Sequence, residues 1–302
     1  GHSEIALLVP PVTADEDVTV TVRNRGAVLF TKTHRLQPVR RFTVYLLPHS
    51  HVDIGYTDLQ WKVEQIHMNN IDAAIALAEK TQDYPEDSRF VWNVETLWAV
   101  DSYLHPGLRL KPQKRDADTN AFAKLERAVK KGWIHLDATY ANVNTSACNS
   151  EELLQLFAFA GELSQQMKTP INSMMQVDIP GTAWGTVTAA AKAGVRYYVN
   201  APNNSDRIGL IREAWEDKPF YWISPSGLDT LLHWQVYPYS LAYAVKGQRI
   251  RNRLWGSGVR PVATDDPTAN FLDPFIFDHL AGLKAKHYPH DMLLLSWALS
   301  DN

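Results

Sequence analysis

The sequence predicts an α/β fold in which a barrel of parallel strands follows a small N-terminal β extension. From Phe42 onward, short apolar runs of strand length alternate with longer segments of helical periodicity, which is typical of repeated βαβ units. The length of 302 residues suits one barrel-sized domain with some additional chain. Several apolar runs end in histidine or acidic residues, and the carboxyl ends of barrel strands are where chemistry is located.

The first forty residues follow a different pattern. Residues 4–32 contain short β-rich runs around turns, so a small antiparallel piece is expected there. Residues 33–41 are basic and are expected to form a linker. We therefore predict an N-terminal β segment and linker over residues 1–40 and a barrel domain over residues 41–302.

The barrel elements follow from apolar periodicity and from turn residues. Gly132 is expected to end a helix, and Ser150 is expected to cap the next one. Barrel strands are predicted at 42–47, 89–94, 133–140, 173–177, 195–199 and 292–299, with a hairpin of 221–223 and 230–234. Helices are predicted at 58–80, 96–104, 121–131, 151–166, 186–193 and 271–286.

Composition excludes several classes of protein. The net charge of −3 argues against a nucleic-acid-binding surface, and no apolar run approaches membrane-spanning length. The single cysteine, Cys148, excludes an internal disulfide framework and a cysteine-based zinc site. No charged-then-apolar leader opens the chain, so we expect a soluble protein. A cytoplasmic location is favoured, a secreted or periplasmic one stays open if a leader was removed, and the oligomeric state is not indicated.

The strongest chemical signal follows the first predicted barrel strand. The apolar run 42–47 ends at Pro48, and His51 and Asp53 come shortly afterwards. Because these two residues are two apart, their side chains point to one side in extended backbone, where an imidazole and a carboxylate can hold a divalent metal such as zinc. His49 is expected to project opposite to His51 and to support the structure. An H-x-D spacing is common by itself, so a histidine with satisfied hydrogen bonds in a loop is the alternative.

The segment 49–56, which reads H-S-H-V-D-I-G-Y, resembles the opening motif of glycoside hydrolase family 38, the α-mannosidases. That motif reads H-[ST]-H-x-D-x-G-W, and its second histidine and its aspartate bind zinc. These two positions correspond to His51 and Asp53, and the family's sugar-stacking tryptophan corresponds to Tyr56. The resemblance implies a distorted (β/α)7-type barrel, zinc as cofactor, and Tyr56 as a substrate-binding residue.

Two further aspartates match the family in the expected order. Asp178 follows the predicted strand 173–177, and it resembles the family nucleophile, which also contacts the zinc. Asp301 follows the strand 292–299 and resembles the general acid/base, although Leu299 stands where the family usually has glycine. The alternatives are a helix-capping role for Asp178 and a solvated terminal position for Asp301. Asn203 follows the predicted strand 195–199 and is expected to reach a sugar hydroxyl, although asparagine is also common in turns.

The resemblance therefore implies a zinc-dependent retaining glycoside hydrolase that acts on α-mannosides or related α-glycosides. His51, Asp53 and Asp178 are the expected zinc ligands. The expected partner is an α-linked glycan or a small glycoside, with no nucleic acid and no membrane.

The sequence also departs from the family pattern. The family's fourth zinc ligand, a histidine downstream of the acid/base, has no counterpart before the chain ends at Asn302, and family enzymes continue into helical and large β domains. We therefore expect a catalytic domain that by itself binds zinc weakly and hydrolyses α-mannosides poorly or not at all. Pro180 replaces a family aromatic residue, and residues 142–146 lack the carboxylates expected there, so mannose specificity stays open.

Two other functions fit the same residues. A metal-dependent carbohydrate deacetylase would also use histidine and aspartate at strand ends, but it would form no covalent sugar adduct and would not need Asp301. A non-catalytic domain that binds glycans would show sugar affinity without turnover. A second H-x-D pair, His135 and Asp137, lies on the third predicted barrel strand, and a hydrogen-bonded core pair is the preferred interpretation for it.

Overall fold

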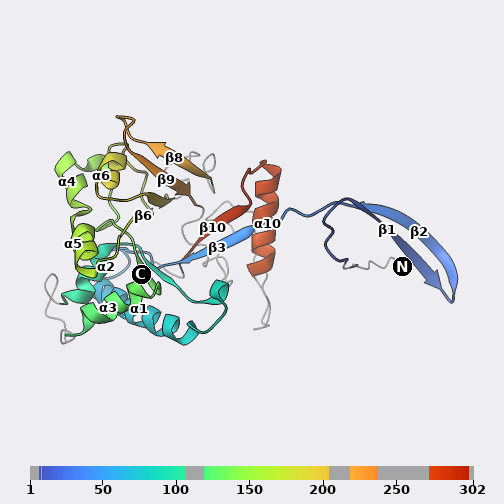
Figure 1. Ribbon diagram of the computed structural model, residues 1–302, viewed down its shortest axis with the longest axis horizontal. Helices are drawn as coiled ribbons and strands as arrows, with labels where there is room; N and C mark the ends of the chain where they lie inside the picture. Colours follow the sequence, from blue (N-terminus) through green and yellow to red (C-terminus); the bar gives the residue numbers. More distant parts are fainter. Residues whose placement is uncertain (1–6, 8, 107–118, 204–217, 237–271, 299–302) are drawn as a thin grey trace. The chain divides into compact units, whose positions relative to one another are not determined.

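The computed structural model describes residues 7, 9–106, 119–203, 218–236 and 272–298 (Figure 1). The chain divides into two compact units, one of residues 1–43 with 289–293 and one of residues 44–288 with 294–302. Among the described helices, none is long and apolar enough to cross a membrane.

The first unit contains a long antiparallel hairpin. Its strands are β1 (Glu16–Asn24) and β2 (Ala27–Leu36), joined by Arg25 and Gly26. Both turn residues have positive φ, 47° and 88°, which is the geometry of a two-residue turn matched to the twist of a hairpin. The antiparallel piece is thus present, but the expected linker is wrong at its start, because residues 33–36 continue β2 and pair with β1.

The second unit is a mixed α/β fold, as the alternating pattern predicted. Its strands are β4 (Trp92–Val94), β5 (Ile134–Leu136), β6 (Ser173–Val177), β7 (Tyr197–Ala201), β8 (Pro219–Ile223) and β9 (Thr230–Gln235), with most of β3 (Thr43–Pro48) and of β10 (Met292–Trp297), whose first residues belong to the first unit. Its helices are α1 (Gln60–Thr81), α2 (Leu97–Leu104), α3 (Ala121–Lys130), α4 (Ser150–Gln155), α5 (Ala158–Met167), α6 (Thr186–Lys192) and α10 (Leu272–Ala285), and short 3-10 turns lie at Glu86–Ser88 and Thr145–Ala147.

The strands form three ladders that isolated bridges connect. β10 pairs with β3, β4 pairs in parallel with β5, and the third sheet has the order β6-β7-β9-β8. Parallel bridges between His49 and Asn93 and between Asp137 and Ser173 join neighbouring ladders. The order of strands is therefore β10-β3-β4-β5-β6-β7-β9-β8, and within the described residues this row does not close into a barrel.

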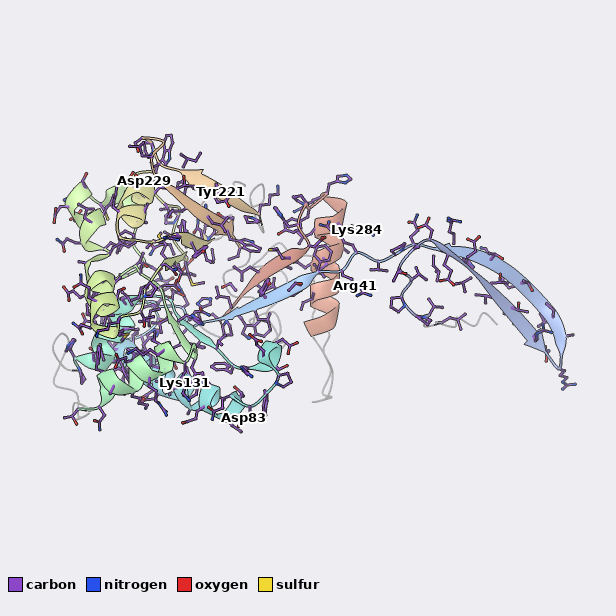
Figure 2. All side chains as sticks on the ribbon, viewed as in Figure 1. Arg41, Asp83, Lys131, Tyr221, Asp229 and Lys284 are labelled. Carbon is purple, nitrogen blue, oxygen red and sulfur yellow. The ribbon has the colours of Figure 1, made fainter. Side chains whose placement is uncertain are left out.

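The predicted hairpin at the end of this row is present. β8 and β9 pair antiparallel, whereas β9 pairs in parallel with β7. Figure 2 shows Tyr221 on β8 and Asp229 just before β9. The carboxylate of Asp229 lies 3.0 Å from Nζ of Lys192, so an ion pair links the hairpin to the end of α6.

One predicted helix is divided in the structure. The segment 151–166 forms α4 and α5, which are separated at Leu156 and Phe157. The N-cap is Asn149 rather than Ser150, because the Asn149 side chain accepts from the Glu152 backbone N–H while the Glu152 carboxylate accepts from the Asn149 N–H. This reciprocal capping box satisfies two N–H groups that a helix start otherwise leaves unpaired.

The core lies on both faces of the strands. The larger cluster packs α1 to α6 against the strands and contains Met174 of β6 and Tyr198 of β7. The smaller cluster contains Met175 and Val177, which point to the opposite face of β6. Leu47 of β3 packs against this smaller cluster, so β3 and β6 contribute to one interior, and the residues that follow these strands are brought toward one another.

Candidate functional site

The site begins where β3 ends. Pro48 ends the strand, and His49 and His51 follow it with only 1% of each residue exposed. The prediction that His49 projects away from His51 is wrong: both imidazoles turn toward one carboxylate, that of Glu95. The physical reason is the two-residue period of extended chain, which places residues 49 and 51 on the same side.

Three predicted ligand residues lie together. Nε2 of His51 is 3.6 Å from Oδ1 of Asp53 and 3.7 Å from Oδ2 of Asp178. One ligand atom from each residue lies within 4.8 Å of the others, a spacing that a single metal ion can bridge. Within the described part of the chain this is the group of histidine and acidic residues with such a spacing, and its donor set of one imidazole and two carboxylates fits zinc or another divalent cation.

Asp178 is held in an unusual conformation just beyond β6. Its φ is 54°, in the left-handed region, which is uncommon for residues other than glycine but is adopted by aspartate more often than by most. Its backbone N–H donates to the carbonyl of Ala201 at 2.9 Å, and its carbonyl accepts from Nδ2 of Asn203 at 3.3 Å. The two bonds fix the turn from the neighbouring β7 end, and the Asp178 side chain keeps 21% of its surface exposed. The turn therefore presents a carboxylate to solvent and to His51 at once.

Sequence reasoning missed one residue of the site, Glu95. It follows β4, has 1% exposure, and accepts hydrogen bonds from both histidines: Oε2 lies 2.7 Å from Nδ1 of His49, and Oε1 lies 2.9 Å from Nδ1 of His51. The backbone N–H of Val52 at 3.2 Å and Nδ2 of Asn142 at 2.5 Å also donate to Oε1. The strand-end position of Glu95 was visible in the sequence, but nothing local distinguishes it from other glutamates.

The histidines and the carboxylates shift each other's pKa. Burial alone lowers the pKa of His51, but the charge of Glu95 and contacts with the two aspartates outweigh burial and raise that pKa well above its usual value. Burial raises the pKa of Glu95, but the two histidines outweigh this effect and hold the pKa well below its usual range. Glu95 is therefore an ionised carboxylate inside the protein, compensated by its histidine partners.

The other predicted site residues have different surroundings. Tyr56 is 81% exposed, so its ring face is open to solvent. Asn203 is buried and uses its amide nitrogen to hold the Asp178 backbone. Asp301 lies outside the described residues.

Comparisons with known proteins identify the family. The family model described as the N-terminal domain of glycosyl hydrolases family 38 matches residues 41–293. Among solved structures, the chain is similar to a protein of glycosyl hydrolase family 38 from Enterococcus faecalis, with a TM-score of 0.52 and 14% identity over 85% of this chain and 23% of that chain. It is also similar to an alpha-mannosidase from Enterococcus faecalis V583, with a TM-score of 0.56 and 16% identity over 85% of this chain and 25% of that chain. No curated protein sequence matches the chain.

The chain thus spans about a quarter of the length of these two structures, and at such low identity the likeness concerns the fold alone. The family match establishes more than the fold, because it covers most of the chain and includes His51, Asp53, Glu95 and Asp178. The resemblance inferred from the opening motif is confirmed: this chain belongs to glycosyl hydrolase family 38, whose N-terminal domain it carries over residues 41–293.

Proposed function

We propose that this domain carries the nucleophile and the metal-binding residues of a zinc-dependent retaining glycosidase that acts on α-mannosides or related α-glycosides. The observation that carries the proposal is the position of Asp178, a partly exposed carboxylate in a left-handed turn beyond β6, 3.7 Å from His51. An alpha-mannosidase among the structural relatives makes an α-mannoside the first substrate to test.

Asp178 has the properties that a glycosidase nucleophile needs. A retaining glycosidase uses one carboxylate to attack the anomeric carbon and a second carboxyl group to protonate the leaving oxygen and later to deprotonate water. The backbone N–H of Asp178 donates to Ala201 and its carbonyl accepts from Asn203, so these two bonds leave the carboxylate available for attack. We assign the acid/base role to Asp301 on the family motif alone.

His51, Asp53 and Asp178 would hold the zinc ion. Bound zinc would orient neighbouring hydroxyls of the sugar and would stabilise charge as the ring flattens. The chain's own contribution is to bring three donor atoms within 4.8 Å and to bury the imidazole that carries one of them. Tyr56 follows His51 and Asp53 in the chain, and its exposed ring is proposed to stack on the sugar.

We further propose that the strand row closes into the distorted (β/α)7-type barrel of the predicted domain 41–302. The two parallel bridges support this proposal, because they already join the three ladders into one continuous order. In such a barrel the residues that follow the strands would gather at one carboxyl end, as expected for a site that includes Asp178.

The test follows the covalent intermediate that a retaining mechanism requires. The 302-residue chain and the product of the complete gene are loaded with zinc and incubated with an aryl α-mannoside and with a slowly released 5-fluoro α-mannosyl fluoride. In whichever of the two proteins turns the aryl α-mannoside over, we expect the rate to fall at least 1,000-fold in Asp178→Asn, a loss of about 4 kcal/mol in transition-state stabilisation, and we expect peptide mass mapping to find the sugar on Asp178.

Asp137→Asn is the matched control, because Asp137 also follows a strand but lies outside the cluster. Turnover that survives in Asp178→Asn, or a sugar adduct on another residue, would contradict the nucleophile assignment. Release of acetate from N-acetyl sugars without an adduct would favour the deacetylase instead.

A further inference from the structure

We propose that Glu95 is a positioning residue that holds the His51 imidazole with Nε2 directed at Asp53 and Asp178. This inference rests on the proposed function, because it concerns the residues that would bind the metal. It goes beyond that function because Glu95 touches neither the proposed metal nor the sugar.

Hydrogen-bond chemistry determines which nitrogen of His51 is available. An ionised carboxylate can only accept, so Oε1 of Glu95 at 2.9 Å requires a hydrogen on Nδ1 of His51. The neutral ring then has its lone pair on Nε2, the atom that lies 3.6 Å from Asp53 and 3.7 Å from Asp178. A metal-binding histidine commonly donates its second N–H to a carboxylate in this way, which fixes the tautomer and makes the ring a stronger donor.

Glu95 is itself held so that it cannot turn away. Its second oxygen accepts from Nδ1 of His49 at 2.7 Å, and Nε2 of His49 lies 2.7 Å from Oγ of Ser296 in β10. The first oxygen also accepts from Nδ2 of Asn142, which lies beyond β5. These hydrogen bonds tie the end of β3 to the end of β4, to β10 and to the segment after β5. His49, His51, Glu95 and Ser296 are buried, so the charge of Glu95 is only weakly screened by solvent.

The four donors around Glu95 allow its shape and its charge to be tested separately. In Glu95→Gln, the amide oxygen can keep the three donors at the Oε1 position, while the amide nitrogen donates to Nδ1 of His49, which must then act as an acceptor. This variant keeps the shape of Glu95 and removes its charge. Glu95→Ala removes both, so the loss in Glu95→Gln measures the effect of the charge and the further loss in Glu95→Ala measures the effect of orientation.

The experiment measures tautomer and metal affinity rather than turnover. In the wild-type chain without metal, ¹⁵N NMR at alkaline pH should show His51 with its hydrogen on Nδ1. The affinity for Zn²⁺, measured by competition with a chromophoric chelator, should fall about tenfold in Glu95→Gln and about 100-fold in Glu95→Ala, within the range known for residues that support metal ligands.

Asp101→Asn is the matched control. Asp101 is also a buried carboxylate that contacts a histidine, His105, at 2.8 Å, but it lies in α2 and contacts none of the three proposed ligands. Its zinc affinity should stay within twofold of wild type. If Glu95 only stabilises the fold, Glu95→Gln and Glu95→Ala should both lower the melting temperature and should have the same zinc affinity. That result would contradict the inference.

The outcomes separate this inference from the proposed function. A wild-type chain that binds no Zn²⁺ would contradict the proposed metal site, and the His51 tautomer would still test the role of Glu95. A wild-type chain that binds Zn²⁺, together with unchanged affinity in Glu95→Gln and Glu95→Ala, would overturn this inference alone. A hydrogen on Nε2 of His51 in the wild type would also overturn it, and this result needs no variant to fold.

Discussion

The pattern H-x-D-x-x-Y occurs twice in this chain, and only one copy lies in the candidate site. The first copy spans residues 51–56 and the second spans residues 135–140. The first copy starts three residues beyond the end of β3, whereas the second starts inside β5. The two copies therefore differ in their place relative to a strand end, although their residue types and spacing agree.

The surroundings of the two histidines differ accordingly. His51 is buried against Glu95 and faces two aspartates, whereas His135 is exposed in the middle of β5. Asp137 is buried and bonds the side chain of Ser173. The interpretation of the second copy as a core pair is thus wrong for His135, which stays at the surface. The first copy gains a second carboxylate from a neighbouring strand end, that of Asp178, and a partner for its imidazole, the carboxylate of Glu95; among the described residues the second copy is not part of such a group.

The largest expected effect comes from removing the two histidines in turn. His51→Ala should weaken Zn²⁺ binding at least 1,000-fold, about 4 kcal/mol, because it removes one of three protein donors. His135→Ala should change the affinity less than twofold. Competition titration of both variants measures the difference directly. Comparable losses in the two variants would show that the second copy binds metal as well and would break the comparison.

The second prediction concerns the aspartates. Burial, reinforced by the negative charge of Glu95, raises the pKa of Asp137 to about 7 from 3.8. Between these values the folded state binds more protons than the unfolded state, so this residue makes stability fall as the pH rises from about 4 to above 7. Asp137→Asn should remove that loss and should raise the free energy of unfolding at pH 8 by about 4 kcal/mol, with little change at pH 4.

Urea unfolding at both pH values measures this effect. Asp229→Asn is the control. Asp229 forms an ion pair with Lys192, so its charge is compensated and its removal should not give the same gain at pH 8. An equal gain at pH 4 and pH 8 for Asp137→Asn would show that packing, rather than the charge, limits stability at this position.

The parts of the site that sequence predicts are the local ones. An apolar run followed by a breaker locates the ends of β3 and β6, and the residues just beyond them are His51, Asp53 and Asp178. Glu95 is different, because its role depends on the pairing of β3 with β4 through His49 and Asn93, which are 44 positions apart in the chain. No local spacing encodes that pairing. One signal was available in the sequence. Residues 49 and 51 are two apart, so extended backbone places both imidazoles on one side, where they can share a hydrogen-bond partner.

The fold shows the same limit. The alternating pattern predicts the order of the elements, and the antiparallel β8–β9 hairpin follows from its turn residues. The division of residues 151–166 into α4 and α5 has no breaker such as proline or glycine at residues 156 and 157, which are both buried in the core. Tertiary packing decides that break, and propensity cannot reveal it.

The third prediction compares His51 with a buried histidine that has no carboxylate beside it. His233 in β9 stacks against the rings of Tyr198 and Trp222, with centroids at 4.5 Å and 5.4 Å, and burial lowers its pKa to about 3 from 6.5. The unfolded state binds the extra proton between these values, so stability from this residue is complete above about pH 6.5 and is lost as the pH falls toward 3. His233→Phe should therefore raise the free energy of unfolding at pH 5 by about 2 kcal/mol relative to its effect at pH 7.

Denaturant unfolding at pH 5 and pH 7 measures this difference. Tyr221→Phe on the neighbouring strand serves as the control, because Tyr221 is 73% exposed and its ring lies outside this stack. If His233→Phe has the same effect at both pH values, burial alone does not keep this histidine neutral. The comparison with His51, whose pKa the carboxylates raise despite burial, would then no longer hold.

The smallest expected effect concerns the tyrosines that end the two copies. Tyr56 is 81% exposed, whereas Tyr140 is partly buried, donates to Asp101 at 2.9 Å and packs edge-on against Phe159. Tyr56→Ala should raise KM for an aryl α-mannoside about fivefold, near 1 kcal/mol, with an unchanged melting temperature, because the ring is proposed to stack on the sugar. Tyr140→Phe should leave KM unchanged and lower the free energy of unfolding by about 1 kcal/mol through the lost hydrogen bond.

Tyr56→Phe completes the test, since it keeps the ring face and should restore KM. A KM that stays high in Tyr56→Phe would assign the role to the hydroxyl group instead of the ring, and equal effects of Tyr56→Ala and Tyr140→Phe on KM would remove the distinction between the two copies at this position.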